Sequence, residues 1–206
     1  MDRDQAVALR ELLSATSAVP EWVAASAEFG WAVQGAPQSA GGLLVAGPAQ
    51  AEPWHFTAHL TDEARWAGLP QLAPTLVRSD PAADAPAHLA VGWERLARAG
   101  RGEALLVVAE FDPQEELLER IDGARRQGAR VLALARSAPE LRGIAHETLV
   151  VPAPVRAEEP GPLTFDTAQH LLSLAVTAAQ RGRRAGLRSR LTRWQERVNG
   201  PTVESW

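Results

Sequence analysis

The 206-residue sequence contains no cysteine, no lysine and no tyrosine. Without cysteine there is no disulfide, no thiol nucleophile and no cysteine-ligated zinc or iron–sulfur cluster. Without lysine there is no Schiff-base catalysis and no P-loop lysine. No apolar run approaches the roughly 18–20 residues that cross a membrane, and the charged N-terminal stretch is not a signal peptide. These absences favour a cytoplasmic protein that has no membrane partner.

The charge that is present is unevenly distributed. The formal net charge is −4, yet seven arginines and a single acid lie between Arg181 and Arg197. Leu187, Leu191 and Trp194 form an apolar stripe there, which predicts an amphipathic helix that packs on the acidic body or on a neighbouring subunit. The isoelectric point near 5.8 argues against a dedicated nucleic-acid-binding protein.

Short apolar runs alternate with helical patterns along the middle of the chain. Strands are predicted over 43–47, 72–77, 104–110, 129–135 and 147–152, and helices over 4–15, 20–34, 53–67, 88–98, 113–128, 139–144 and 163–180. In the clearest strand–helix–strand unit, Asp112 is predicted to cap the helix and Gly128 to end it. The alternation is typical of an α/β three-layer sandwich around a five-stranded parallel sheet, with N-terminal helices and a basic C-terminal helix.

Two stretches resemble the sugar isomerase (SIS) domain, which is flavodoxin-like. GLLVAG…WHFTAHL…GLPQLAPTLV resembles its first half, and LLVVAEFDPQ…ETLVVP resembles its second half. The similarity spans roughly residues 40–180 and is closest to the phosphoheptose isomerase subgroup. It implies N-terminal helices over 1–38, a SIS-like domain over 39–180, and a basic helix and tail over 181–206.

The resemblance also implies self-association, because SIS domains commonly pair into dimers and tetramers. We therefore expect a homodimer or homotetramer in which the N-terminal helices make part of the subunit contact. Trp22 and Trp31 are candidates for that contact, since tryptophan is frequent in cores and interfaces.

The loop that binds phosphate in the family is altered. Its S-T-S-G-x-S pattern is replaced by AEFDPQ over Ala109–Gln114, so hydroxyls are lost and the carboxylates of Glu110 and Asp112 appear. Phosphate sites use backbone N–H groups, hydroxyls and helix N-termini, and nearby carboxylates repel the dianion. We therefore expect that this chain does not bind a phosphosugar in the family's way.

Two residue pairs suggest a metal site. By the resemblance, His55 keeps a family histidine and His59 takes the place of a glutamate, and residues four apart share one helix face. Asp166 and His170 are also four apart, on the last predicted helix. If the two helices meet as in the family, the four residues suit a divalent metal such as zinc. The alternative is that the histidines are partly buried polar residues bonded to their neighbours.

Two classes of function remain open. The first is a non-catalytic, oligomeric regulatory module that binds a sugar-like or other small molecule, or a protein partner. The second is a metal-dependent, phosphoheptose-isomerase-like aldose–ketose isomerase that uses His55 and His59 and acts on a sugar or sugar phosphate, with His59 and Glu110 as the catalytic acid/base groups. In either case, the expected ligand-binding residues are Gly47, Gln50, Trp54, Asp112 and Gln114.

Overall fold

The computed structural model describes residues 20–137, 139–152 and 163–178. The predicted helix over 4–15, the connector over 153–162 and the basic segment from 181 onward lie outside these ranges. None of the described helices is long and apolar enough to cross a membrane.

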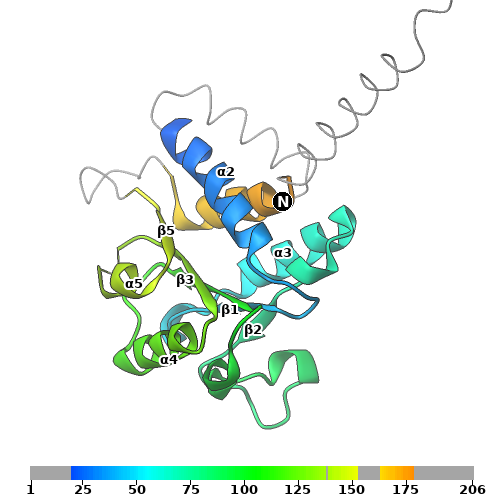
Figure 1. The fold of residues 1–206 in the computed structure, drawn as a ribbon, viewed down its shortest axis with the longest axis vertical. Coiled ribbons are helices and arrows are strands. Elements are labelled where there is room, and N and C mark those ends of the chain that lie inside the picture. Colours follow the sequence, from blue (N-terminus) through cyan, green and yellow to red (C-terminus); the bar gives the residue numbers. More distant parts are fainter. Residues whose placement is uncertain (1–19, 138, 153–162, 179–206) are drawn as a thin grey trace, which may run out of the picture.

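A five-stranded sheet forms the centre of the molecule. Its strands are β1 (Leu43–Ala46), β2 (Thr75–Val77), β3 (Ala104–Ala109), β4 (Arg130–Ala135) and β5 (Glu147–Val150). All the pairings are parallel and the order is β2-β1-β3-β4-β5 (Figure 1). This is the flavodoxin-like order. Every residue of β1 and β3 is buried because helices cover both faces, and the α/β prediction is thereby confirmed.

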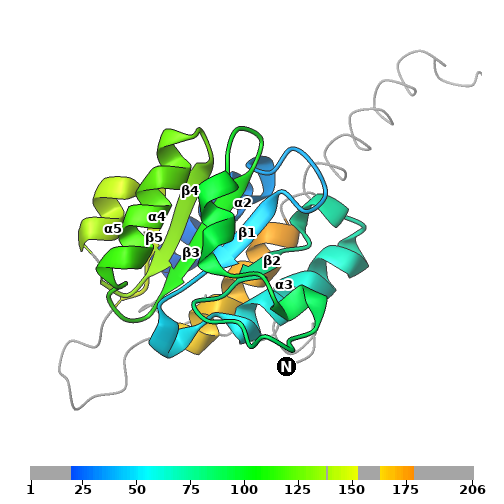
Figure 2. The ribbon, with the colours of Figure 1, turned by 90° about the horizontal axis from the view of Figure 1, so that it is seen from below.

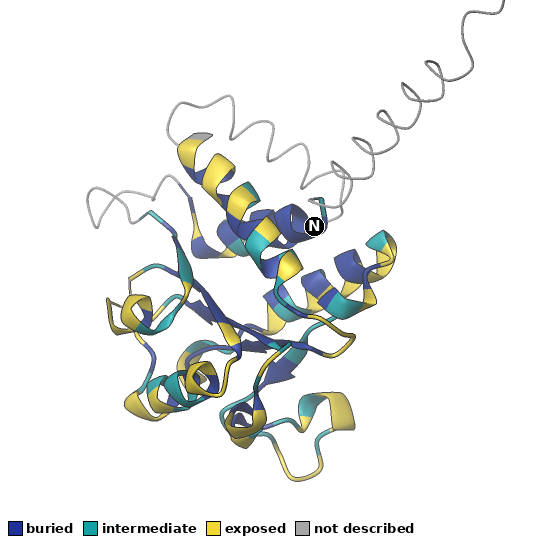
Figure 3. Ribbon diagram, viewed as in Figure 1, coloured by how far each residue is buried: buried dark blue, intermediate teal, exposed yellow. Residues whose placement is uncertain are grey.

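The helices form two layers, one on each face of the sheet (Figure 1), and Figure 2 views the molecule from the side of α4. One layer contains α2 (Pro20–Gly35), α3 (Trp54–Ala67) and a helix over 165–178, which we call the C-terminal helix. The other contains α4 (Glu115–Arg126), α5 (Pro139–Ile144) and the 3-10 segment Trp93–Arg98. Alternate strand residues point into the two resulting cores, and Figure 3 shows the buried residues concentrated between the layers.

Two helices of the first layer touch through their backbones. A Cβ atom added at Gly30 of α2 would lie 2.8 Å from the carbonyl carbon of Ala175 and 2.9 Å from its oxygen. The side-chain amide of Gln34 donates a hydrogen bond of 3.0 Å to the carbonyl of Val176 nearby. Glycine at position 30 therefore lets α2 and the C-terminal helix approach this closely.

The two tryptophans of α2 have different environments. Trp22 is 7% exposed, and its indole N–H donates to the carbonyl of Val150 at 2.8 Å. It is therefore a core residue, and its predicted place in a subunit contact is wrong for this reason. Trp31 is 58% exposed, and its place in such a contact stays a prediction.

The predicted helix over 88–98 is replaced by two short 3-10 segments, Ala87–Leu89 and Trp93–Arg98. Between them, the carbonyl of Val91 accepts a 2.8 Å hydrogen bond from the backbone N–H of Arg78, and Gly92 forms a parallel bridge with Arg78. Because the Val91 carbonyl is bonded to the end of β2, it cannot accept the hydrogen bond that a continuous helix over 88–98 would need there.

The start of α4 also differs from the prediction. The helix begins at Glu115, and Gln114 rather than Asp112 occupies the cap position, with an extended backbone and no capping bond from its side chain. Pro113 separates Asp112 from the cap, and the Gln114 amide is instead bound to the loop after β1. The predicted stop at Gly128 is confirmed, since its φ of 97° suits glycine in the turn after the helix.

Candidate metal centre and the loops beside it

Three histidines meet between α3 and the C-terminal helix. His55 and His59 lie one turn apart on α3, and His170 faces them from the C-terminal helix, with ring centroids 4.3–4.7 Å apart. Each imidazole offers a nitrogen, and these three nitrogens all lie within 4.8 Å of one another. The two helices that the sequence analysis paired therefore do bring their histidines together.

Asp166 binds the edge of this cluster. Its Oδ1 lies 3.0 Å from Nδ1 of His55, and its Oδ2 lies 3.6 Å from Nε2 of His170. Nε2 of His55 is 2.9 Å from Nε2 of His59, so one of these two nitrogens must carry the shared proton. The carboxylate thus fixes the ring of His55 with its Nε2 directed at the other imidazoles.

Local sequence explains why the four side chains are held there. Phe56 and Leu60 anchor an adjoining side of α3 in the core, which leaves His55 and His59 at the edge of the helix rather than beneath it. The C-terminal helix starts after Thr164, whose hydroxyl oxygen accepts the backbone N–H of Thr167 at 3.1 Å. Asp166 and His170 follow one turn apart on that helix.

Burial lowers the pKa of His59, and the neighbouring His170 and His55 lower it further, while Asp62 opposes the shift. Burial also lowers the pKa of His170, where Asp166 opposes the shift and His55 adds to it. Both imidazoles are therefore held in their neutral form, which has the free lone pair that binds a metal.

The altered phosphate loop is joined to the loop after β1. The side-chain amide of Gln114 donates to Oε1 of Gln50 at 2.6 Å, and its own oxygen accepts the backbone N–H of Ala49 at 3.4 Å. Gly47 has no room for a side chain, because an added Cβ would lie 2.6 Å from the carbonyl oxygen of Val108. Three predicted ligand-binding residues thus have structural contacts within this edge of the sheet.

Glu110 and Asp112 lie on the loop after β3. The carboxylate of Glu110 accepts a 3.3 Å hydrogen bond from Arg136, at the end of β4. Arg136 in turn lies 5.7 Å from the ring centroid of Phe165. Asp112 is exposed. The pairing of His59 with Glu110 in catalysis stays a prediction.

Glu52 forms a network that the sequence analysis missed. Its carboxylate accepts hydrogen bonds from Nε of Arg78, from the backbone and hydroxyl of Ser79, and from the indole of Trp54, at 2.8–3.1 Å. Burial raises the pKa of Glu52, but these bonds from Ser79 and Arg78 outweigh it and the pKa is lowered. Arg78 and Ser79 lie more than 25 residues from Glu52, so only the parallel pairing of β1 with β2 could have indicated these two partners.

No family model and no curated protein sequence matches this chain. Among solved structures, it is similar to the NanR protein of Vibrio vulnificus complexed with ManNAc-6P, with a TM-score of 0.49 and 12% identity over 95% of this chain and 70% of that one. It is also similar to the sugar isomerase domain of the RpiR transcription factor from Sphaerobacter thermophilus. There the TM-score is 0.51 and the identity 15%, over 84% of this chain and 87% of that one. The chain therefore has the fold of the sugar isomerase (SIS) domain, as its sequence predicts.

Proposed function

We propose that this chain is a SIS-fold binding module whose centre holds a divalent metal of the zinc class on His55, His59 and His170. The observation that carries the proposal is the triangle of three imidazole nitrogens within 4.8 Å. Zinc binds histidine at about 2.0–2.1 Å, which places tetrahedral ligand atoms roughly 3.3 Å apart. Small side-chain rotations would bring the three nitrogens to that spacing.

Asp166 suits the role of an orienting carboxylate better than that of a fourth ligand. Metal-binding histidines usually donate their second ring N–H to a carboxylate, and Asp166 occupies that place on Nδ1 of His55 at 3.0 Å. Three protein ligands leave a position for an oxygen of a bound molecule. When bound, the ion supplies Lewis-acid attraction for a hydroxyl or carbonyl oxygen.

The loops beside the centre favour a neutral, hydroxylated ligand without a phosphate group. The N–H of Ala49, which could serve an anion, is taken by the side chain of Gln114. Arg136 is engaged by Glu110, and Asp112 adds a further carboxylate to the same loop. A phosphate dianion would therefore meet repulsion where the family pattern offers hydroxyls.

The proposal of binding without turnover is supported by the contacts of the two predicted acid/base groups. His59 belongs to the metal triangle, and Glu110 is paired with Arg136. The RpiR transcription factor, whose sugar isomerase domain shares this fold, shows that the fold also occurs in regulators. The second candidate, an aldose–ketose isomerase, is favoured by the lowered pKa of His59, because a neutral imidazole can act as a base.

Metal titration tests the proposal. Purified protein stripped of metal should take up one zinc ion per chain in calorimetry, and elemental analysis should find it after dialysis. His59→Ala and His170→Ala should each weaken binding by about tenfold or more. His146→Gln is the matched control, because Gln keeps an acceptor for the Val131 N–H that His146 binds at 3.0 Å. If no stoichiometric zinc, nickel or manganese binds, the proposal fails.

A second measurement separates the two candidates. Zinc-loaded protein is incubated with unphosphorylated aldoses, and ketose formation is followed by NMR. The binding module predicts that the sugars produce shifts at the histidines without forming ketose. Ketose formation that disappears in His59→Ala would favour the isomerase instead.

A further inference from the structure

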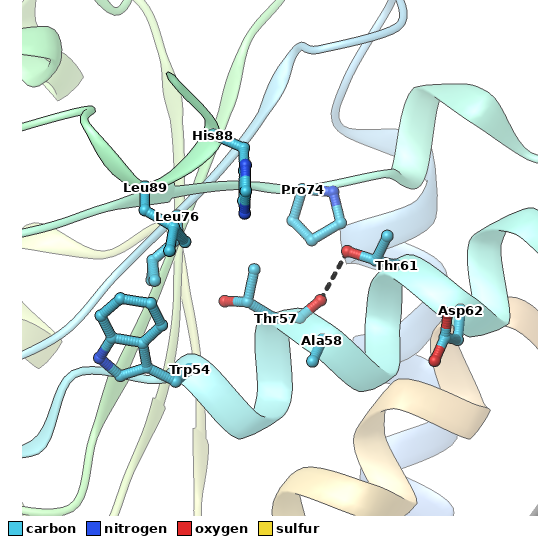
Figure 4. Close-up of a pocket in the computed structure, with 9 residues that line it drawn as sticks. All are labelled: Trp54, Thr57, Ala58, Thr61, Asp62, Pro74, Leu76, His88 and Leu89. Carbon is cyan, nitrogen blue, oxygen red and sulfur yellow. Dashed lines mark hydrogen bonds between the residues drawn. The ribbon is translucent and has the colours of Figure 1, made fainter. Parts of the chain in front are cut away.

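A cavity of about 560 Å³ lies on the face of α3 next to the one that carries the histidines. Its other walls come from β2 and the 3-10 segment Ala87–Leu89, as Figure 4 shows. Small-molecule sites commonly enclose about 300–1,000 Å³ and combine apolar walls with a few polar groups. The cavity has this size and this mixture, and neither the SIS fold nor the metal centre requires it.

One end of the cavity is an apolar platform. Trp54 lies there beside Leu76 and Leu89 (Figure 4). The indole is held in place, because its N–H donates to Glu52 at 3.1 Å and the guanidinium of Arg78 lies 4.3 Å from its ring centroid. A fixed indole presents a flat aromatic surface without first having to be ordered by a ligand.

The other end offers hydrogen-bond acceptors and negative charge. The hydroxyls of Thr57 and Thr61 donate their hydrogens to the carbonyls of Pro53 and Thr57, each at 2.7 Å, so only their lone pairs face the cavity. Asp62 lies at the rim of the same end (Figure 4), on the side of α3 toward His59, whose pKa its charge raises. Of the lining residues in the described part of the chain, none is an arginine and one, His88, is a histidine, and the sequence has no lysine (Figure 4).

We propose that this cavity binds a small aromatic amine, with its ring on Trp54 and its ammonium group toward Asp62. Eight residues of α3 separate the two ends, which is about 12 Å at roughly 1.5 Å per residue. The side chains at both ends reach inward and shorten this distance, so a bicyclic ring with a short aminoalkyl chain can span it. An ammonium group can donate hydrogen bonds to the hydroxyl oxygens of Thr57 and Thr61, and its positive charge is opposite to that of Asp62.

Tryptamine is the probe for the test, and indole-3-propionate, which has the same ring and the opposite charge, is its counterpart. In NMR titrations of the full chain, tryptamine should shift the Trp54 indole N–H and the backbone signals of Thr61 and Leu89. For a molecule of this size, we expect a Kd on the order of 0.1–1 mM. Asp62→Asn should weaken tryptamine binding roughly two- to fivefold, and indole-3-propionate should bind more weakly than tryptamine.

A cavity-filling variant with a matched control makes the test decisive. Ala58→Trp places an indole in the cavity from an exposed position of α3 and should abolish the Trp54 shift. Ala24→Trp, at an exposed position of α2, adds the same side chain elsewhere and should leave tryptamine binding unchanged. The proposal is overturned if tryptamine binds Ala58→Trp as well as the wild type, if it fails to bind the wild type at all, or if the carboxylate probe binds as tightly.

Discussion

Helix α3 carries two neighbouring polar faces that differ in where their hydrogen bonds go. On one face, His55 and His59 bond to each other and to Asp166 of another helix. On the next face, Thr57 and Thr61 bond to carbonyls of α3 itself. The first arrangement draws two helices into a compact centre, whereas the second leaves the adjoining space open. Polar residues of one helix thus form a cluster when they bond to a different helix, and they leave a cavity beside them when they bond to carbonyls of their own helix.

The largest effect is expected from a variant that removes the core contact by which both faces of α3 are held in place. Phe56 is 1% exposed and anchors α3 in the core, so Phe56→Ala should lower the free energy of unfolding by about 3–5 kcal/mol. Urea denaturation measures this, and both zinc and tryptamine binding should weaken together. Trp66→Ala, at a side chain 60% exposed on the same helix, should change stability by less than about 0.5 kcal/mol. Equal losses in the two variants would show that α3 is not anchored through Phe56.

The second-largest effect is expected from a variant that weakens binding at the cavity face of α3 and leaves binding at its histidine face unchanged. Glu52→Gln removes a carboxylate that is 8% exposed and accepts bonds from Arg78, Ser79 and Trp54, at an expected cost of about 1–3 kcal/mol. Tryptamine binding should fall because Trp54 loses its fixed position, while zinc affinity stays the same. Because the pKa of Glu52 is lowered in the folded chain, the free energy of unfolding of the wild type should fall as the pH drops below the ordinary pKa of a glutamate. The variant should show a smaller fall over the same pH range.

Asp166→Asn should give the reverse pattern. Without the carboxylate on Nδ1 of His55, zinc affinity should fall about tenfold, because an amide holds the ring less firmly and makes it less basic. Tryptamine affinity should not change. Parallel titrations of one protein preparation with both ligands measure the difference. A loss of both ligands would mean that the variant disturbs α3 as a whole.

The smallest expected effect is a pH dependence specific to the histidine face. The unfolded chain protonates these imidazoles near pH 6.5, whereas the folded chain keeps His59 and His170 neutral to lower pH. The unfolded state then binds more protons, so the free energy of unfolding of metal-free protein should be constant above about pH 6.5 and fall below it. Denaturant titrations across this range measure the slope. His170→Gln should reduce it.

The sequence predicted those features that depend on local patterns. The buried runs of β1, β3 and β4 appear as uninterrupted apolar residues, and four-residue spacing placed His55 with His59 and Asp166 with His170. The prediction that these two helices meet came from the family resemblance, because residue spacing within each helix says nothing about which helices are neighbours. The distant pairing of Arg78 with Val91, which breaks the predicted helix over 88–98, leaves no local signal. The same holds for the Glu52 network and for the cavity beside Trp54, since both depend on loops that meet in space.

The backbone contact at Gly30 has a consequence for anyone who would redesign the histidine centre. The separation of α2 from the helix that carries His170 is set by main-chain atoms, so no rotamer change can absorb a substitution there. A methyl group at position 30 would lie 2.8 Å from the Ala175 carbonyl carbon, and the shift that relieves this contact exceeds the roughly 0.2 Å tolerance of metal–ligand distances. The coordination chemistry of this scaffold is therefore limited by a residue that has no side chain and belongs to a different helix.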